Sequence, residues 1–406
     1  MKEHEYKKGT KNTTGPIVVD GKVITGRNCE YGDDTRDECF IAAHDAVTGN
    51  EVWRFTVPAA PGEPGGDTWG DKPVSSRTCS PWGLPGGYNA EKGLLYWMVG
   101  NSSPHTRIKR YNGDPFAIPL SSPTELYCNS TLALDIDTGE LAWYYQHLPG
   151  DDWDYDPGHE QVQFSSAFNP DPDSVKWINP NIPRGEVRDM LVSAGESGGL
   201  WVLDAVTGEF LWAMPFPYDD PDFHIADINV ETGQTMIHRD KILVEDDQVL
   251  EKICFANTRS YWPMAYHAGN NSLYVSYHDA CDKRIGALMT GNGHIMQGFI
   301  RTGPNADDWV GLAKVNMETG QIDRIHTQRI PSNGAILLTA GDLLFWGDMD
   351  RRLRAFDVNS GEILWETIIG GIIQTSTITY SVNGRQYIAV LTGEGTGGTG
   401  SKAALV

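Results

Sequence analysis

Short segments of alternating apolar and polar residues recur along the chain, and several end in the same polar turn. Leu200–Leu203 is one such segment, and its alternation predicts a β-strand. The sequence that follows has the pattern Asp-x-x-Thr/Ser-Gly-x-x-x-Trp, which occurs at 45–53, 135–143, 204–212 and 357–365. A weaker copy at 316–324 begins with Asn and has Arg324 in place of the Trp. Chance does not produce four such copies, so the chain is built from a repeated unit.

Each residue of the repeat has a physical role in a tight turn. Asp and Thr side chains accept hydrogen bonds from nearby backbone groups, and Gly adopts positive φ angles without strain. The returning strand then carries a Trp at a constant offset, where it can pack against a neighbouring unit; we therefore expect Trp53, Trp143, Trp212 and Trp365 to be such docking residues. Sheets that stack through one repeated aromatic contact predict an all-β fold, a β-propeller. A β-sandwich of unrelated hairpins is the alternative.

The spacing of the repeats predicts how many sheets the chain holds. The first residues of the copies lie 90, 69, 112 and 41 positions apart. A step of 41 matches one blade of about 40–50 residues, so longer steps hold unmarked blades or insertions. We expect roughly six blades in a single domain over 1–406, because no linker divides the chain.

Composition and charge narrow the function classes. The chain has 45 Gly and 23 Pro, which favours turns over long helices, and its net charge of −22 disfavours nucleic acid or an anionic membrane as a partner. No apolar run is long enough for a membrane helix. No signal peptide is visible, so the protein is cytosolic or the sequence lacks its true start. Six Cys are too few for a disulfide scaffold, and none forms a Cys-x-x-Cys motif.

The repeat and several segments in the same order resemble the pyrroloquinoline-quinone-dependent alcohol dehydrogenases. The resemblance extends along almost the whole chain and is carried by the segments 15–24, 96–104, 151–156, 339–345 and 386–391. It implies an eight-bladed type of propeller. Members of that family are longer at the N-terminal end, with a signal peptide and further blades, so we expect an incomplete propeller here. The resemblance also implies a periplasmic location.

The resemblance implies that the chain oxidises a primary alcohol to an aldehyde. Hydride passes to metal-bound pyrroloquinoline quinone, and electrons pass on to a cytochrome c-type acceptor. Asp154 corresponds to the general base that takes the hydroxyl proton, a task for which a positioned carboxylate is suited. Because four Asp lie within 151–156, an ordinary solvated acidic loop is the alternative.

Four residues correspond to the family's metal site: Glu30, Asn101 and Asp154, with Asp156 as an additional carboxylate. Oxygen ligands suit hard cations. An Asp two residues beyond the base resembles the lanthanide-dependent branch, so a lanthanide(III) ion is favoured and Ca²⁺ is the alternative. Taken alone, Glu30 could belong to a solvated acidic loop, and Asn101 could be a turn residue.

The resemblance also assigns residues around the cofactor. Trp82 corresponds to the residue on which the quinone stacks, and Thr78 approaches its polar edge, with Glu30 and Asn101 contributing from the metal site. Cys254 and Cys281 lie where some members have a disulfide, which would indicate an oxidising compartment, or they are two buried thiols. The other four Cys match no pair in the family.

Two departures from the family favour a rival hypothesis. Glu196 falls where members place an Arg or Lys near the quinone, unless the register shifts or another cation such as Arg259 or Arg284 substitutes. The family's ring of adjacent cysteines is also missing. Glu196 and the missing N-terminal blades are what a partial enzyme would show, so a non-catalytic propeller scaffold, or an inactive fragment of such an enzyme, is the alternative to the enzyme. A sugar-oxidising relative is a third possibility. The resemblance also allows a homodimer.

Overall fold

The protein is almost entirely built from antiparallel β-strands. The computed structural model describes residues 15–29, 35–81, 85–157, 159–217, 224–245, 248–253, 262–285, 295–301, 307–374, 376–393 and 404–405. In these residues the helical elements are short: α1 (Arg107–Arg110) and 3₁₀ turns at Arg36–Glu38, Val74–Ser76, Arg239–Lys241 and Ala268–Asn270. The all-β prediction is confirmed.

Six sheets follow one another in sequence order within the described residues. The first is β1 (Ile17–Val19), β2 (Lys22–Arg27), β3 (Phe40–Asp45) and β4 (Glu51–Thr56). The second is β5 (Gly87–Asn89), β6 (Leu94–Val99), β7 (Ser130–Asp135) and β8 (Leu141–Gln146). The third has the order β10-β13-β12-β11-β9 and comprises β9 (Val162–Ala167), β10 (Trp177–Ile178), β11 (Val187–Ala194), β12 (Gly199–Asp204) and β13 (Phe210–Pro215).

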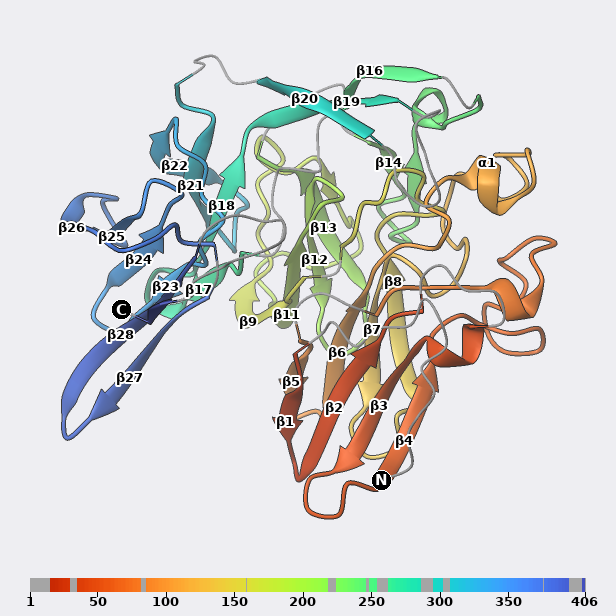
Figure 1. The fold of residues 1–406 in the computed structure, drawn as a ribbon, viewed down its shortest axis with the longest axis horizontal. Coiled ribbons are helices and arrows are strands. Elements are labelled where there is room, and N and C mark those ends of the chain that lie inside the picture. Colours follow the sequence, from red (N-terminus) through yellow and green to blue (C-terminus); the bar gives the residue numbers. More distant parts are fainter. Residues whose placement is uncertain are drawn as a thin grey trace.

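The remaining three sheets of the series come from the C-terminal half. The fourth is β17 (Ala265–His267), β18 (Ser272–His278), β21 (Val310–Asn316) and β22 (Ile322–Gln328). The fifth is β23 (Leu337–Leu338), β24 (Leu343–Gly347), β25 (Arg352–Asp357) and β26 (Ile363–Ile368). The sixth is β27 (Thr377–Val382), β28 (Arg385–Thr392) and β29 (Ala404–Leu405). The sheets follow an arc, with the first and the last at its two ends (Figure 1).

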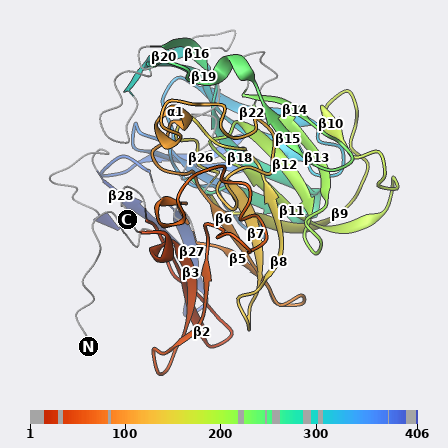
Figure 2. The ribbon, with the colours of Figure 1, turned by 90° about the vertical axis from the view of Figure 1, so that its right-hand side faces the viewer.

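The long steps between repeats are insertions. Each pair of successive marked turns belongs to successive sheets, so no unmarked blade lies between them in the described residues. The longest step contains the pair β14 (Ile225–Ile228) and β15 (Thr235–Ile237), and also the sheet of β16 (Val249–Ile253), β19 (Ala280–Ile285) and β20 (Ile295–Arg301). That sheet lies at one edge of the molecule in both views (Figures 1 and 2).

The repeated turns have the predicted geometry. Asp45 Oδ1 accepts hydrogen bonds from the Thr48 backbone nitrogen (2.6 Å) and hydroxyl (2.8 Å), and Gly49 has φ +73°. The same bonds recur at Asp135, Asp204 and Asp357, and Asn316 accepts the equivalent backbone bonds in the weaker copy. These bonds span three residues, which explains why the turn is encoded locally.

The docking role is confirmed for three of the four tryptophans. The Trp53 ring packs directly on Gly139 of the next sheet, where an added β-carbon would lie 2.6 Å from it, and its Nε1 donates to Ile136 O at 2.9 Å. Trp143 packs on Gly208 in the same way, and Trp212 lies beside Gly320. These rings are buried between successive sheets. We call a Trp of one sheet that packs on the turn Gly of the next sheet a docking joint.

Trp365 differs from the prediction. Its residue is 48% exposed, and no described glycine lies against its ring. The reason is that the sixth sheet lacks, in the described residues, the turn that forms the other half of a docking joint. The described part of the chain also contains no helix with the length and apolarity needed to cross a membrane.

Candidate active site

Three of the predicted metal ligands converge beside the second sheet. Asn101 follows β6, whereas Asp154 and Asp156 lie in the loop after β8. The Asn101 Nδ2 donates to Asp154 Oδ1 at 2.6 Å, and the Asn101 backbone nitrogen donates to Asp156 Oδ1 at 2.8 Å. Asn101 and Asp156 are buried, and Asp154 is partly exposed. Residues more than 50 positions apart in sequence therefore share one site.

The acidic loop is a folded element rather than a solvated surface. Asp151, Asp152 and Asp156 are buried. Asp151 Oδ2 accepts backbone hydrogen bonds from Asp154 (2.9 Å) and Tyr155 (3.0 Å), and this holds Asp154 at a φ of +68°. Positive φ is uncommon at non-glycine residues, and Asp is one of the residues that tolerate it when hydrogen bonds hold the loop. The loop that carries Asp154 is therefore a folded element, although the Asp154 side chain itself stays partly exposed.

Burial also shifts the proton affinity of this loop. Desolvation raises the pKa of Asp151, although the Tyr155 backbone bond opposes the shift. Desolvation likewise raises the pKa of Asp152 to about 7. The Asp152 carboxylate oxygens accept hydrogen bonds from the backbone nitrogens of Arg107 (2.5 Å) and Leu243 (2.6 Å). Asp151 and Asp152 thus shape the loop, and Asp154 is the carboxylate that the loop leaves partly accessible.

A buried ion pair clamps the two loops that carry the site. Arg110 Nε lies 2.8 Å from Glu125 Oε1, with both side chains almost fully buried. The Arg110 guanidinium also donates to the backbone oxygens of His105 (2.6 Å) and Asp151 (2.7 Å). One cation therefore holds the segment after Asn101 against the acidic loop. Removing one partner of such a pair leaves an uncompensated buried charge, which is strongly destabilising.

His105 is a site residue that the sequence did not indicate. Its buried ring places Nδ1 at 2.9 Å from Asp154 Oδ1 and at 2.7 Å from Asn101 Nδ2. It follows Asn101 by four residues in an irregular segment, so no helical or strand periodicity marks it. Its position beside the predicted base was set by tertiary folding.

The described residues fit an oxygen-liganded cation. Asn101 Oδ1 is buried and has no hydrogen-bond partner among the described residues, whereas the amide nitrogen is engaged. A buried carbonyl oxygen without a partner, in a residue that contacts two carboxylates through its nitrogen atoms, is the type of ligand that a hard cation takes. In the described part of the chain no group of three His, Cys, Asp or Glu side chains could hold a metal ion. Glu30, the remaining predicted ligand, lies outside the described residues.

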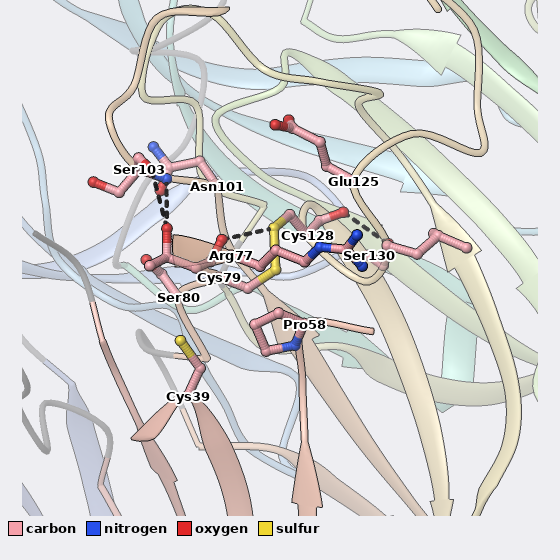
Figure 3. The surroundings of a disulfide bond; sticks show 12 residues. Cys39, Pro58, Arg77, Cys79, Ser80, Asn101, Ser103, Glu125, Cys128 and Ser130 are labelled. Carbon is pink, nitrogen blue, oxygen red and sulfur yellow. Dashed lines mark hydrogen bonds between the residues drawn. A yellow bond between two sulfur atoms is a disulfide. The ribbon is translucent and has the colours of Figure 1, made fainter. Parts of the chain in front are cut away.

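Thr78 lies near this site and directly precedes a disulfide cysteine in the chain. The buried Thr78 hydroxyl donates a hydrogen bond to Ser103 O at 3.1 Å and accepts one from the Ser103 backbone nitrogen, also at 3.1 Å. The Cys79–Cys128 disulfide follows directly, with Asn101 and Ser103 on one side of it (Figure 3). It ties the Thr78 segment to the start of β7. Trp82, the predicted stacking residue, lies outside the described residues.

All described cysteines are in disulfides. Cys29 pairs with Cys39, and Cys79 with Cys128; the sequence had assigned no partners to these four residues. The first bridge joins the end of β2 to the start of β3. Cys281 is buried and disulfide-bonded, and Cys254, its expected partner, lies outside the described residues.

The segment around Glu196 does reach the site. Its backbone nitrogen donates to Asp156 O at 3.3 Å, and the side chain is half-buried. Gly195 packs so closely that an added β-carbon would lie 3.1 Å from the Pro157 backbone. The segment that the resemblance places near the quinone therefore packs against the acidic loop. Of the two substitute cations, Arg259 lies outside the described residues, as does the side chain of Arg284.

These features define the class of protein: an arc of antiparallel sheets joined by tryptophan docking, with an amide and two carboxylates converging beside one sheet. The family model for the PQQ-type "glucose/ethanol/alcohol dehydrogenase, beta-propeller domain" matches residues 1–217 and 307–388, well over half of the chain. The chain belongs to this family.

Individual relatives agree with this assignment. The chain is 28% identical over 419 residues to the quinohemoprotein alcohol dehydrogenase ADH-IIG of Pseudomonas putida, covering 96% of this chain and 54% of the relative. It is also 28% identical over 443 residues to the quinohemoprotein alcohol dehydrogenase of Comamonas testosteroni, with the same coverage. A solved europium-containing methanol dehydrogenase has the same fold, with a TM-score of 0.76, 24% identity, and coverage of 95% of this chain and 66% of that one. The chain spans about half the length of these curated relatives.

Proposed function

We propose that this chain oxidises a primary alcohol to the aldehyde with pyrroloquinoline quinone and a bound cation, and that Asp154 is its general base. One observation carries the proposal. Asn101 and Asp156 meet in a direct hydrogen bond, as do Asn101 and Asp154, while the Asn101 carbonyl oxygen is buried without a partner among the described residues. This arrangement supports a cation-binding site over a plain scaffold.

Asn101, Asp154 and Asp156 would hold the cation together with Glu30. Three carboxylates and one amide oxygen favour a highly charged cation, so we propose a lanthanide(III) ion over Ca²⁺. Trp82 would stack on the quinone, and Thr78 would contact its polar edge. When bound, the quinone supplies the hydride acceptor and the cation polarises its carbonyl.

Asp154 would accept the alcohol hydroxyl proton while the alcohol carbon gives up hydride. The Asn101 amide and the His105 ring hold Asp154 Oδ1, so the carboxylate is oriented before substrate arrives. The Asp151 carboxylate accepts hydrogen bonds from the Asp154 and Tyr155 backbone nitrogens and so maintains the loop around Asp154. Such positioning of a proton acceptor contributes about 10²- to 10⁴-fold to a rate.

The test is reconstitution of the purified chain with pyrroloquinoline quinone and with La³⁺, Ca²⁺ or no metal, followed by dye-linked alcohol oxidation. Asp154→Asn should lower kcat by at least about 10²-fold. Asp240→Asn, whose side chain is 80% exposed, is the matched control and should leave kcat unchanged. A folded chain that binds no quinone with either metal would refute the enzyme and leave the scaffold alternative.

The choice of cation has its own test. Asp156→Asn removes the charge but keeps an oxygen for the Asn101 backbone bond. We expect it to weaken La³⁺ binding roughly tenfold more than Ca²⁺ binding, because a trivalent ion gains more from an added carboxylate. Isothermal titration of both ions measures this, and equal losses would contradict the lanthanide preference.

The electron acceptor and the location are part of the same proposal. We propose a cytochrome c-type acceptor and a periplasmic location. The disulfides Cys29–Cys39 and Cys79–Cys128 support an oxidising compartment, since such bonds do not persist in a reducing cytosol. A homodimer stays a prediction, which light scattering of the purified chain would test.

A further inference from the structure

Asn129 lies where the two segments that carry the candidate site leave the second sheet. It directly precedes β7, its side chain is buried, and its φ is +51°. The Asn129 backbone nitrogen donates to Gly100 O at 2.8 Å, and the Asn129 backbone oxygen accepts a hydrogen bond from the His147 nitrogen at 2.9 Å. Gly100 directly precedes Asn101, and His147 begins the segment that leads to Asp154. One residue is therefore bonded to the start of both site segments.

The side chain of Asn129 adds a second link to the acidic loop. Its Nδ2 donates to Tyr155 O at 3.0 Å. Tyr155 lies between Asp154 and Asp156, and its backbone nitrogen donates to Asp151 Oδ2 at 3.0 Å. The two peptide groups that join Tyr155 to the carboxylate residues on either side are therefore both hydrogen-bonded.

These hydrogen bonds close a ring that includes two of the proposed cation ligands. Asn129 binds Gly100 O through its backbone and Tyr155 O through its side chain. The residues that follow these two in the chain, Asn101 and Asp156, bind each other, because the Asn101 backbone nitrogen donates to Asp156 Oδ1 at 2.8 Å. The ring thus sets the separation between the amide and the acidic loop before a cation arrives.

Asparagine meets both requirements of this position. The left-handed backbone conformation is open to Gly and Asn, whereas most other residues are strained there. Gly has no side-chain donor, so it could not bind Tyr155 O. The two partners of this bond are 26 positions apart in the chain, so no local sequence pattern indicates the role of Asn129.

We propose that Asn129 is a positioning residue of the cation site. It sets the gap between the Asn101 oxygen and the carboxylates of Asp154 and Asp156, so that these ligands close around the ion and exclude water from it. This inference rests on the proposed function, which takes the three residues as cation ligands. The affinity of an oxygen-liganded site depends on the rigidity of its ligands, and partners in the outer shell contribute about 10- to 100-fold to it.

Luminescence of Eu³⁺ titrated into the purified whole chain with pyrroloquinoline quinone tests the proposal. The titration gives the affinity, and the lifetimes in H₂O and D₂O count the water molecules on the bound ion. Asn129→Gly keeps the left-handed backbone and removes only the donor to Tyr155 O. We expect this variant to bind Eu³⁺ about tenfold more weakly, or weaker still, and to leave more water on the ion.

Two variants serve as matched controls. Asn383→Gly alters another Asn with a φ of +51°, which is exposed in the turn between β27 and β28. Asn179→Ala removes a buried amide of the third sheet, whose Nδ2 donates to Phe210 O at 2.8 Å, and so deletes the same type of hydrogen bond. Both variants should bind Eu³⁺ with the affinity and the water count of the unaltered chain.

The outcomes separate this inference from the proposed function. An affinity and a water count in Asn129→Gly equal to those of the two controls would overturn the role of Asn129 and leave the proposed function intact. If the unaltered chain binds no Eu³⁺, or if Asp154→Asn and Asp156→Asn leave the binding unchanged, the proposed function is refuted and this inference with it.

A second variant covers the case in which Asn129→Gly does not fold. Asn129→Asp keeps the size of the side chain and tolerates the same φ, but it presents an acceptor in place of the donor to Tyr155 O. We expect the ion bound to this variant to carry more water than in the unaltered chain. An unchanged water count in the folded Asn129→Asp chain would also overturn the proposal.

Discussion

Trp53 and Trp365 occupy the same position in two copies of one repeat, but their surroundings differ. Trp53 is 7% exposed, packs on Gly139 and donates a hydrogen bond to Ile136 O; Trp365 is 48% exposed beside an apolar groove. Both precede a following sheet, but only the sheet after Trp53 presents a docking turn among the described residues. The difference shows that the repeat encodes the turn and the strand, whereas the neighbouring sheet decides whether the indole stabilises the fold.

The largest effect is expected from Trp53→Ala. The substitution removes the ring that fills the space over Gly139, and also the hydrogen bond to Ile136 O. Buried Trp-to-Ala changes cost about 3–5 kcal/mol. Urea unfolding followed by circular dichroism measures the loss, and a loss under about 1 kcal/mol would mean that this docking joint contributes little to stability.

A matched pair of glycine substitutions isolates the docking contact. Gly139 and Gly49 have nearly the same φ, +72° and +73°, so Ala costs about 1 kcal/mol in backbone strain at both. Only at Gly139 would the new methyl group meet a ring, at 2.6 Å. Gly139→Ala should therefore lower the free energy of unfolding by about 1–3 kcal/mol more than Gly49→Ala does. Equal losses in the two unfolding curves would argue against Trp-on-Gly docking.

Lowering the pH should reduce the free energy of unfolding through His147, which lies in the interior of the arc. This buried side chain follows β8, and burial lowers its pKa to about 3. Unfolded His takes up a proton near pH 6.5, so the free energy of unfolding falls as the pH drops below that value. The loss is about 2 kcal/mol between pH 6.5 and pH 5. His147→Gln should remove this part of the slope, and an unchanged slope in unfolding curves at the two pH values would contradict the assignment.

The smallest effect is expected from Trp365→Ala in the isolated chain. Its ring is half exposed and has no glycine against it among the described residues, so the free energy of unfolding should change by about 0.5 kcal/mol or less. The same urea titration measures it. A loss as large as that of Trp53→Ala would show that Trp365 is already docked in solution.

Sequence alone determined the features that depend on neighbouring residues. The turn at Asp45–Gly49 forms through hydrogen bonds that span three residues, and Gly49 supplies the positive φ. The strand alternation on either side predicted antiparallel sheets, and the spacing of the turns predicted roughly six of them. The resemblance named Asn101, Asp154 and Asp156, which fold into one site, whereas the placement of Glu30 and Trp82 stays a prediction.

Only the tertiary structure decided which of these features meet. Asn101 and Asp154 are 53 positions apart and Cys79 and Cys128 are 49 apart, and no local pattern indicates either contact. The ring of His105 reaches Asp154 because Arg110 clamps the two loops together. Burial of the acidic loop and exposure of Trp365 likewise depend on what packs against them. Short-range hydrogen bonds are encoded in a few consecutive residues, but desolvation and long-range contacts exist only once the sheets have packed.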